Sequence, residues 1–395
     1  MSHLLTICID LPFPDPMENA YPGAHLGIII DHASRWDTVQ LDMTSIQLRK
    51  FLDMIREPLS CVRILELSVI EDADHTQSSI LFEPVFSLAP IVHSVMYGIS
   101  MSTFPLSLSN LTTLCCDQNE PPELLHILEQ ATELKSLRII PEPSTHPGNP
   151  LTSHKPIVNH PILRRLTIFI HRPQRYIPPA IPVIIDSICL SGLRELELVM
   201  HDMPGIAFMP LFGSEDMTRI YNLLRRSGCA LDILHIYSPL PWSNLLPTIL
   251  MQAQSLTTLH LSINTATTLP VFHALSVKRN LSGGSAVIGT VQLPNLQHST
   301  FSEEPSTGTD VGIMKSIGVL YDAILSCREY PGIKRLKSLT LIIVGKLLEA
   351  LRNNPATGFG LLHLIGLKSS GLNVKFLVDG DDVLEADGWL ELLGQ

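Results

Sequence analysis

The sequence predicts an α/β solenoid, with a parallel β-sheet on its concave face and helices on its convex face. Three observations support this fold class. A short apolar motif recurs along the chain, the end of each copy alternates like a strand, and a helical pattern precedes several copies. Each helix–strand unit would leave its apolar face bare unless a neighbouring unit covered it, so the units are expected to stack.

The motif is leucine, two variable residues, leucine, one variable residue and a further apolar residue. The clear copies are Val62-Leu65-Leu67, Leu134-Leu137-Ile139, Leu163-Leu166-Ile168, Leu193-Leu196-Leu198, Leu231-Leu234-Ile236, Leu256-Leu259-Leu261 and Leu336-Leu339-Leu341. Weaker copies are Trp36-Val39-Leu41, Val92-Val95-Tyr97, Leu111-Leu114-Cys116 and Leu293-Leu296-His298, the last with a histidine in its third position. The last two positions of each copy have the period of a strand with one buried face.

Helical patterns precede several of these strands, with apolar residues spaced i, i+3, i+4 and i+7. One such segment stops just before Pro58, a second follows the helix-starting pair Pro121-Pro122, and a third has Gly228 placed to end it. The apolar positions are Leu48, Phe51, Leu52 and Ile55; Leu124, Ile127, Leu128 and Ala131; Met217, Ile220, Tyr221 and Leu224; and Ile317, Leu320, Tyr321 and Ile324.

The motif is that of a leucine-rich repeat, with irregular repeat lengths. First positions lie 29 residues apart from Leu134 to Leu163, but 38 apart from Leu193 to Leu231. Leucine-rich repeats usually span about 20–29 residues, so about ten irregular repeats with insertions are expected. We predict a lead-in or cap over 1–30, the solenoid over 31–378 with loops near 141–161 and 282–308, and a solvated acidic tail over 379–395 that caps the last repeat.

Composition restricts the class of protein. Hydrophobic residues make up 45% of the chain and charged residues 16%, which is typical of a folded protein. The net charge of −11 argues against a nucleic-acid surface, although one local basic patch stays open. The odd number of cysteines, seven, suits neither a disulfide framework nor a zinc site. We read neither a signal peptide nor a membrane span, and expect an intracellular protein of the cytoplasm or nucleus.

Three runs carry a resemblance to a known family. The segments from His32 to Leu41, Arg226 to Leu231 and Leu293 to His298 resemble phrases of fungal F-box/leucine-rich-repeat proteins, and the likeness extends roughly from Gly23 to Val378. In that family an N-terminal F-box docks on the adaptor of a cullin ubiquitin ligase, and the repeats hold the substrate. Here Leu11-Pro12 is followed by a proline-broken segment, so we expect the F-box to be missing. The adaptor would be a partner only if an F-box function survives.

No motif in the sequence matches a complete catalytic or cofactor-binding pattern. Gly283-Gly284-Ser285 is the nearest approach to a nucleophile elbow, and Gly345-Lys346 lacks the rest of a phosphate-binding loop. The segment from Asp379 lacks two calcium ligands. Cys115-Cys116 could be a redox pair, but Cys116 fits the third apolar position of a repeat better. We therefore predict no catalytic residue, no cofactor and no enzyme activity.

Histidines in and after the proline-rich loop are the remaining candidates for a metal site. Their spacing fits no helix face and no acidic or cysteine partner is fixed, so a solvated loop is preferred to a metal centre. These residues are His146, His154, His160 and His171.

The strand residues between the buried leucines should line the concave wall and bind a protein ligand. We predict this role for Arg138, Arg165, Phe169, Glu195, Glu197, His235, Tyr237 and His260, with Glu66, Thr167 and Thr340 on the same wall. The alternative for each is an ordinary solvated strand position. The predicted function is therefore a non-catalytic interaction solenoid resembling an F-box substrate receptor. A free-standing scaffold or truncated non-functional fragment is the alternative, and an unrecognised enzyme is a further one.

Overall fold

A computed structural model gives the structure of the protein, which forms two compact units, Met1–Gly192 and Leu193–Gln395. Both are α/β units built on mostly parallel sheets whose neighbouring strands follow one another in the chain, consistent with a solenoid-like arrangement within each unit. The structure describes residues 4–10, 23–70, 85–99, 106–117, 121–140, 157–171, 180–201, 214–237, 246–263, 271–272, 275, 293–303, 312–328, 335–343, 355–378 and 380–385.

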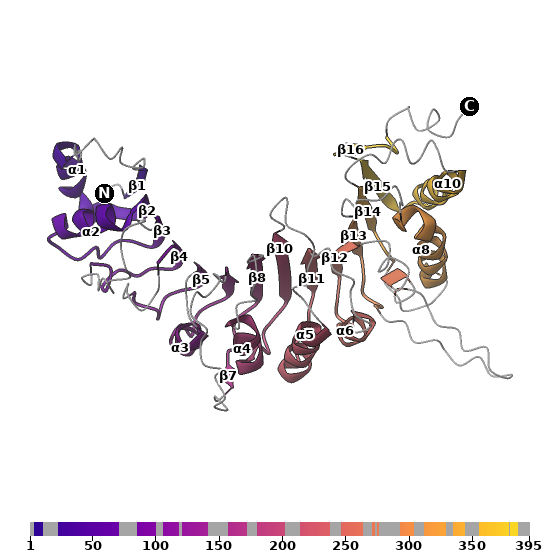
Figure 1. Cartoon of the computed structure of the whole chain (residues 1–395), viewed down its shortest axis with the longest axis horizontal. Coiled ribbons are helices and arrows are strands. Elements are labelled where there is room, and N and C mark those ends of the chain that lie inside the picture. Colours follow the sequence, from indigo (N-terminus) through magenta and orange to yellow (C-terminus); the bar gives the residue numbers. More distant parts are fainter. Residues whose placement is uncertain are drawn as a thin grey trace. The chain divides into compact units, whose positions relative to one another are not determined.

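The first unit contains parallel strands in chain order, with helices on one side of them (Figure 1). The strands are β1 (Leu5–Asp10), β2 (Trp36–Thr44), β3 (Ile64–Ile70), β4 (His93–Tyr97), β5 (Thr113–Cys116), β6 (Ser136–Ile139) and β8 (Arg165–His171). A small separate sheet pairs β7 (Val158–Asn159) with β9 (Ile188–Cys189). The helices are α1 (Gly23–Ile30), α2 (Ser45–Met54), α3 (Pro121–Gln130) and α4 (Ala180–Ser187), with a 3₁₀ turn at Ala33–Arg35.

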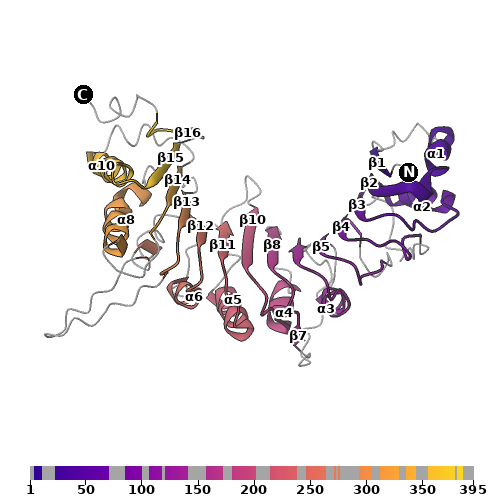
Figure 2. The same ribbon diagram turned by 180° about the vertical axis from the view of Figure 1, so that it is seen from behind.

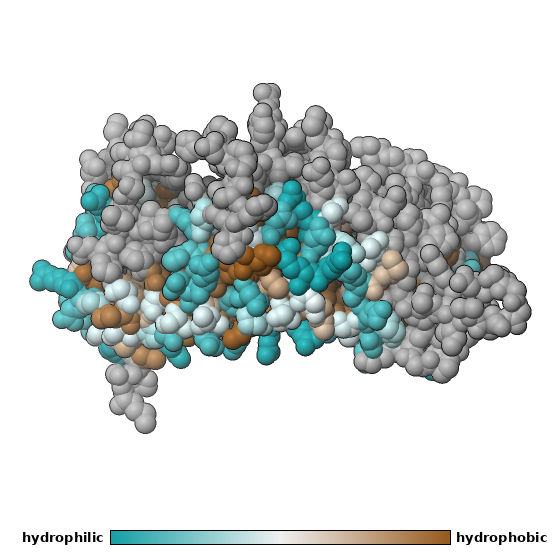
Figure 3. Space-filling model, turned by 90° about the horizontal axis from the view of Figure 1, so that it is seen from below, coloured by the Kyte–Doolittle hydropathy of each residue, from teal (hydrophilic) through white to brown (hydrophobic). Residues whose placement is uncertain are grey.

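The second unit repeats the same plan (Figure 2). Its parallel strands are β10 (Glu195–His201), β11 (Ile233–Tyr237), β12 (Thr258–Ile263), β13 (His298–Glu303), β14 (Ser338–Ile343) and β15 (Asn373–Val378), and β16 (Asp381–Asp382) joins antiparallel to β15. The helices are α5 (Ser214–Ser227), α6 (Leu246–Gln252), α8 (Gly312–Arg328) and α10 (Pro355–Ser369). Figure 3 shows the side seen from below, where hydrophobic residues are interleaved with hydrophilic ones. None of the described helices is long and apolar enough to cross a membrane.

The repeated leucines form the core, as the motif predicts. In unit 2, Leu196 pairs in register with Leu234 and Leu234 with Leu259, and all three side chains have no exposed surface. In unit 1 the first position of the opening copy, Trp36, is fully buried and its ring stacks on that of Phe51 in α2. Stacked rows of apolar side chains therefore run across each sheet on the side that the helices cover.

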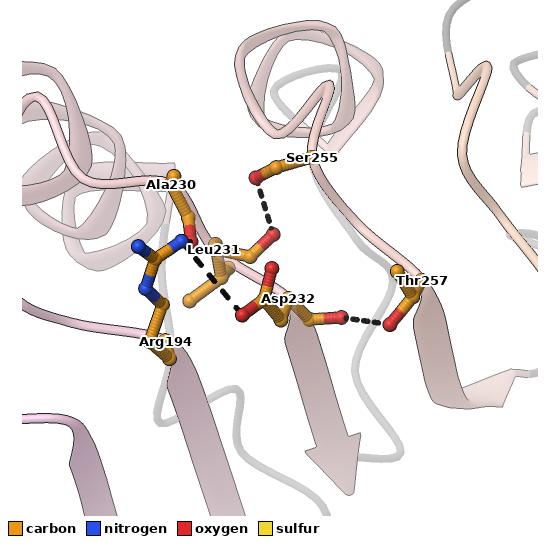
Figure 4. Close-up of polar contacts among 6 residues, drawn as sticks. All are labelled: Arg194, Ala230, Leu231, Asp232, Ser255 and Thr257. Atoms are coloured by element: carbon orange, nitrogen blue, oxygen red, sulfur yellow. Dashed lines mark hydrogen bonds and ion pairs between the residues drawn. The ribbon is translucent and has the colours of Figure 1, made fainter.

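A ladder of backbone hydrogen bonds fixes the register at the start of each strand. The Arg194 carbonyl accepts from the amides of Asp232 (2.8 Å) and Ile233 (2.9 Å), and the Asp232 carbonyl accepts from Thr257 (2.9 Å) and Thr258 (3.1 Å). Side chains reinforce the ladder (Figure 4). The Thr257 hydroxyl donates to the Asp232 carbonyl at 3.1 Å, and the Arg194 guanidinium donates to the Ala230 carbonyl at 3.0 Å. The Arg194 and Asp232 carbonyls thus each accept hydrogen bonds from two amides of the following unit, which satisfies backbone groups that turns often leave to water.

Two predicted copies of the motif are wrongly phased. Register places Ser94 opposite Leu65 and Met96 opposite Leu67, so the copy in β4 is Ile91-Ser94-Met96 and not Val92-Val95-Tyr97. Ile91, Ser94 and Met96 have no exposed surface. A shift of one residue exchanges the two faces of a strand, so Tyr97 lies on the opposite face from the core.

The copy in β13 is displaced by three residues. Ser299 pairs with Leu259 and Phe301 with Leu261, which gives Leu296-Ser299-Phe301 in place of Leu293-Leu296-His298. Phe301 is fully buried and His298 is exposed, so the histidine does not occupy a core position. The buried hydroxyls of both serines, Ser94 and Ser299, have no hydrogen-bond partner within the described structure.

The predicted helices are found, with one boundary moved. In α2, Thr44 and Gln47 form a capping box that satisfies two amides at the N-terminus. The helix ends at Met54, four residues before Pro58, whereas the sequence suggested that it continues almost to the proline. Gly228 has φ +56° and its amide bonds to the Leu224 carbonyl, which confirms it as the residue that ends α5.

The two ends of the described sheet add strands to those that the motif predicts. β1 lies in the region that we expected to be a lead-in, and it pairs with β2 through Ile7–Val39 and Ile9–Leu41. At the other end, Val383 and Leu384 follow β16 and are buried, so this part of the acidic segment packs on β15 and is not a solvated tail. Residues 141–156, 282–292 and 304–308 of the predicted loops lie outside the described residues. The described parts of the same ranges are not loop throughout, because β7 lies within the first and β13 within the second.

Candidate protein-binding faces

Each sheet has an open face, formed by the strand residues that alternate with the buried positions and point away from the helices. Register brings them into rows across neighbouring strands. In unit 1, Arg138 pairs with Thr167, and in unit 2, Glu197 pairs with His235 and His235 with His260. The residues predicted to line the binding wall therefore lie on open faces, divided between two separate units.

In unit 1 the central feature is an arginine held over an aromatic ring. The guanidinium carbon of Arg138 in β6 lies 4.0 Å from the ring centroid of Phe169 in β8. Phe169 is only 9% exposed and Thr167 only 5%, so these two residues form the floor beneath the exposed Arg138. Arg165, also exposed, precedes them on the same face of β8. A cation stacked on a ring keeps its N–H donors available while its side chain is restrained.

Next to this arginine lies a tyrosine–cysteine contact that the sequence reasoning missed. The Tyr97 hydroxyl is 3.4 Å from the Cys115 sulfur. Burial, with the contact to Cys115, raises the pKa of Tyr97 to about 12, and burial also raises the pKa of the Cys115 thiol. A thiol that keeps its proton is a poor nucleophile, so this pair offers hydrogen bonding rather than covalent chemistry.

The neighbouring cysteines, Cys115 and Cys116, do not face each other. Cys115 lies on the open face, and Cys116 is fully buried in the third position of its repeat, as the sequence indicated. Successive side chains on a strand point to opposite faces, so the arrangement does not favour a redox pair. Neither forms a disulfide with another described cysteine.

In unit 2 the open face carries a cluster of three rings. The Tyr237 and His260 ring centroids lie 4.6 Å apart, His235 and His260 lie 5.6 Å apart, and the Tyr237 hydroxyl is 3.2 Å from His260 Nδ1. Burial and the nearby His235 lower the pKa of His260 to about 4, so its ring is neutral at pH 7. Burial, followed by the charge of Glu197, raises the pKa of Tyr237. The cluster is therefore a partly buried aromatic surface beside a glutamate, in which the His260 ring is neutral at pH 7.

The His260 ring should make the stability of unit 2 depend on pH. An unfolded histidine titrates near 6.5 and folded His260 at about 4, so between these values the unfolded chain binds a proton that the folded one does not. The folded state should lose stability as the pH falls from about 6.5 to about 4. Because the ring is partly open to solvent, we expect about 1–2 kcal/mol relative to His260→Gln. Urea denaturation of both proteins at pH 7 and pH 4 measures this difference, and parallel changes would contradict it.

The histidines suggested as a solvated loop or metal site do not behave as a group. His160 is 3% exposed, and its ring bridges two backbone groups: Nδ1 accepts from the Leu163 amide at 3.1 Å and Nε2 donates to the Ala131 carbonyl at 3.0 Å. The solvated-loop interpretation is therefore wrong for His160, because the ring replaces backbone hydrogen bonds inside unit 1. His146, His154 and the side chain of His171 lie outside the described residues.

The described structure adds no support for the other candidate sites, those for a metal ion, calcium, a nucleophile or a phosphate group. Across the described part of the chain, no three histidine, cysteine or acidic side chains are placed to hold a metal ion. In the acidic segment, one Asp382 oxygen accepts from the amides of Phe376 and Leu384, so it closes the β15–β16 turn. Gly283-Gly284-Ser285 and Gly345-Lys346 lie outside the described residues.

Fold and site together define an α/β protein whose mostly parallel strands follow one another in the chain, consistent with a solenoid-like arrangement, and present aromatic and charged side chains on their open faces. No protein-family model matches the chain, and a comparison with curated proteins finds no significant relative.

Proposed function

We propose that this protein is a non-catalytic interaction protein, a curved leucine-rich-repeat solenoid that binds protein ligands through the open faces of its sheets. The observation that carries the proposal is the alignment, by parallel register, of large aromatic and cationic side chains on neighbouring strands. Tyr237 lies against His260 on β12, and Arg138 lies over Phe169. Tyrosine and arginine are the residues that most often anchor protein interfaces.

The packing of these anchors supports the proposal. A side chain that is already restrained loses less conformational entropy when a partner binds, so more of the contact energy appears as affinity. Arg138 is restrained by Phe169, and Tyr237 by its hydrogen bond to His260. The thiol of Cys115 and the hydroxyl of Tyr97 add hydrogen-bonding groups on the same face as Arg138.

The biological role that the resemblance suggests is substrate recognition, as in F-box/leucine-rich-repeat receptors of ubiquitin ligases, inside the cell. A free-standing scaffold that uses the same faces without a ligase is the second form of this proposal. Recovery of a cullin-ligase adaptor together with the protein distinguishes the receptor from the scaffold.

Replacing Arg165 and Tyr237 together by alanine should abolish or strongly reduce partner capture. Both are open-face side chains, and truncating an anchor typically costs more than about 1 kcal/mol of binding each. Stability should change little, because neither side chain fills a leucine position of the core. The measurement is affinity purification of the tagged protein from its own cells, with quantitative mass spectrometry of the proteins recovered.

A matched control replaces Tyr221 and Arg225 by alanine, which removes the same two residue types from helix α5. This variant should recover the same proteins as the parent. If the Arg165/Tyr237 variant also recovers them at parental levels, the open faces are not the binding surface.

A further inference from the structure

A cluster of cations is concentrated at one place on the acidic chain. Lys135, Arg138, Arg164 and Arg165 all come from β6, β8 or the residues just before these strands, and all four side chains are exposed. The ladder brings Lys135 and Arg164 together, since the Arg164 amide donates to the Lys135 carbonyl at 2.8 Å. The chain as a whole carries a net charge of −11, so the positive charge of this cluster is opposite in sign to the net charge of the protein.

One exposed carboxylate, Glu133, lies two residues before Lys135, and the cations outnumber it at the start of β6 and β8. The described open-face residues of β6 and β8 are Ser136, Arg138, Arg165, Thr167 and Phe169, none of which is acidic. Glu66 lies on β3, where its carboxylate is 3.9 Å from His93, and Asp117 accepts a hydrogen bond from the Gly98 amide. Arg165 also takes part in contacts within the protein, so the basic cluster offered to a partner comprises Lys135, Arg138 and Arg164.

We propose that the basic cluster of Lys135, Arg138 and Arg164 docks an acidic segment of a protein partner, laid across β6 and β8. This inference rests on the proposed function and specifies the chemistry of the partner on unit 1. Charge complementarity carries it: carboxylates would meet three exposed cations, one of which is pre-positioned over Phe169 with its N–H groups available for a carboxylate.

A nucleic acid fits the same cations less well. Phosphate binding relies on a broad basic surface that neutralises several phosphates, and the three cations on β6 and β8 form only a small one. The cluster spans two neighbouring strands, which is the extent of a short peptide segment rather than of a duplex groove.

The test uses three fluorescein-labelled ligands. They are a peptide of alternating glutamate and serine, a control peptide in which every glutamate is replaced by glutamine, and a single-stranded DNA with the same charge as the glutamate peptide. Fluorescence anisotropy with the full chain should show binding of the glutamate peptide, weakening as salt rises, and no comparable binding of the glutamine peptide. The triple variant Lys135→Gln, Arg138→Gln, Arg164→Gln should bind about tenfold more weakly, as expected for the loss of three exposed charge contacts.

Two further variants separate charge at this cluster from overall charge and from folding. The control Arg49→Gln, Arg56→Gln, Arg225→Gln removes three exposed cations from other places and should bind within about twofold of the parent. The double variant Lys135→Gln, Arg164→Gln keeps the contact of Arg138 with Phe169, and it should show an intermediate loss with unchanged melting.

Equal binding by the parent and the triple variant, or no binding of the glutamate peptide at all, would overturn the proposal. Tighter binding of the DNA, lost in the same variant, would overturn it in favour of a nucleic-acid ligand. None of these results decides the proposed function, which depends on the proteins that the Arg165/Tyr237 variant fails to capture.

Discussion

Replacing Leu196 by aspartate is expected to destabilise unit 2 by more than about 4 kcal/mol, the effect of leaving an unpaired charge in a dry core. Leu196 has no exposed surface, and its neighbour in register, Leu234, is equally buried. The carboxylate would have no cation to pair with in this apolar row. Urea denaturation followed by circular dichroism measures the loss.

The matched control is Val199→Asp on the same strand. Val199 pairs with Tyr237 on the open face and is partly exposed, so the new carboxylate can remain hydrated. We expect a change below about 1 kcal/mol, within the range of surface strand substitutions. If Leu196→Asp unfolded at the same urea concentration as the parent, the repeat register of unit 2 would be wrong.

The second large effect is expected for Gly98→Ala. Gly98 follows β4 with φ +70°, in the left-handed region that side chains other than glycine rarely adopt, and a methyl group there would overlap the Val69 carbonyl. Strain and overlap together should cost about 3–5 kcal/mol. The substitution would also disturb the hydrogen bond from the Gly98 amide to Asp117.

Gly228→Ala separates the two causes. Gly228 has φ +56°, but an added methyl group would meet nothing within 4 Å, so only the backbone strain of about 1 kcal/mol should appear. Thermal denaturation of the two variants beside the parent gives the comparison. Equal losses would mean that the close approach of β3 to the Gly98 turn contributes nothing.

The leucine spacing predicts most of the repeats, and it fails where serine replaces leucine. The two misphased copies are those whose second position is Ser94 or Ser299. Each serine is buried among apolar residues. Because the leucine of the second position is missing, the motif can be aligned equally well on neighbouring apolar residues, one or three positions away. Only the register between neighbouring strands, which depends on residues far apart in the sequence, decides between these alignments of the motif.

The candidate site shows the same division between local and long-range information. Alternation along each strand is enough to place Arg138, Glu197, His235 and His260 on open faces. The contacts of Arg138 with Phe169 and of Tyr237 with His260 depend on the register between strands separated by loops of different length. The role of Tyr97 was hidden because the misphased copy assigned it to the core.

The ladder at the strand starts explains how repeats of unequal length can coexist. Its bonds join residues as little as 20 positions apart, as from Thr112 to Val92, and as many as 40 apart, as from Gln297 to Thr257. The entropy of closing a flexible loop grows only with the logarithm of its length, so this doubling costs about 0.6 kcal/mol. A connecting segment can therefore lengthen at little thermodynamic cost while the strands that it joins, and the surface they present, keep their alignment.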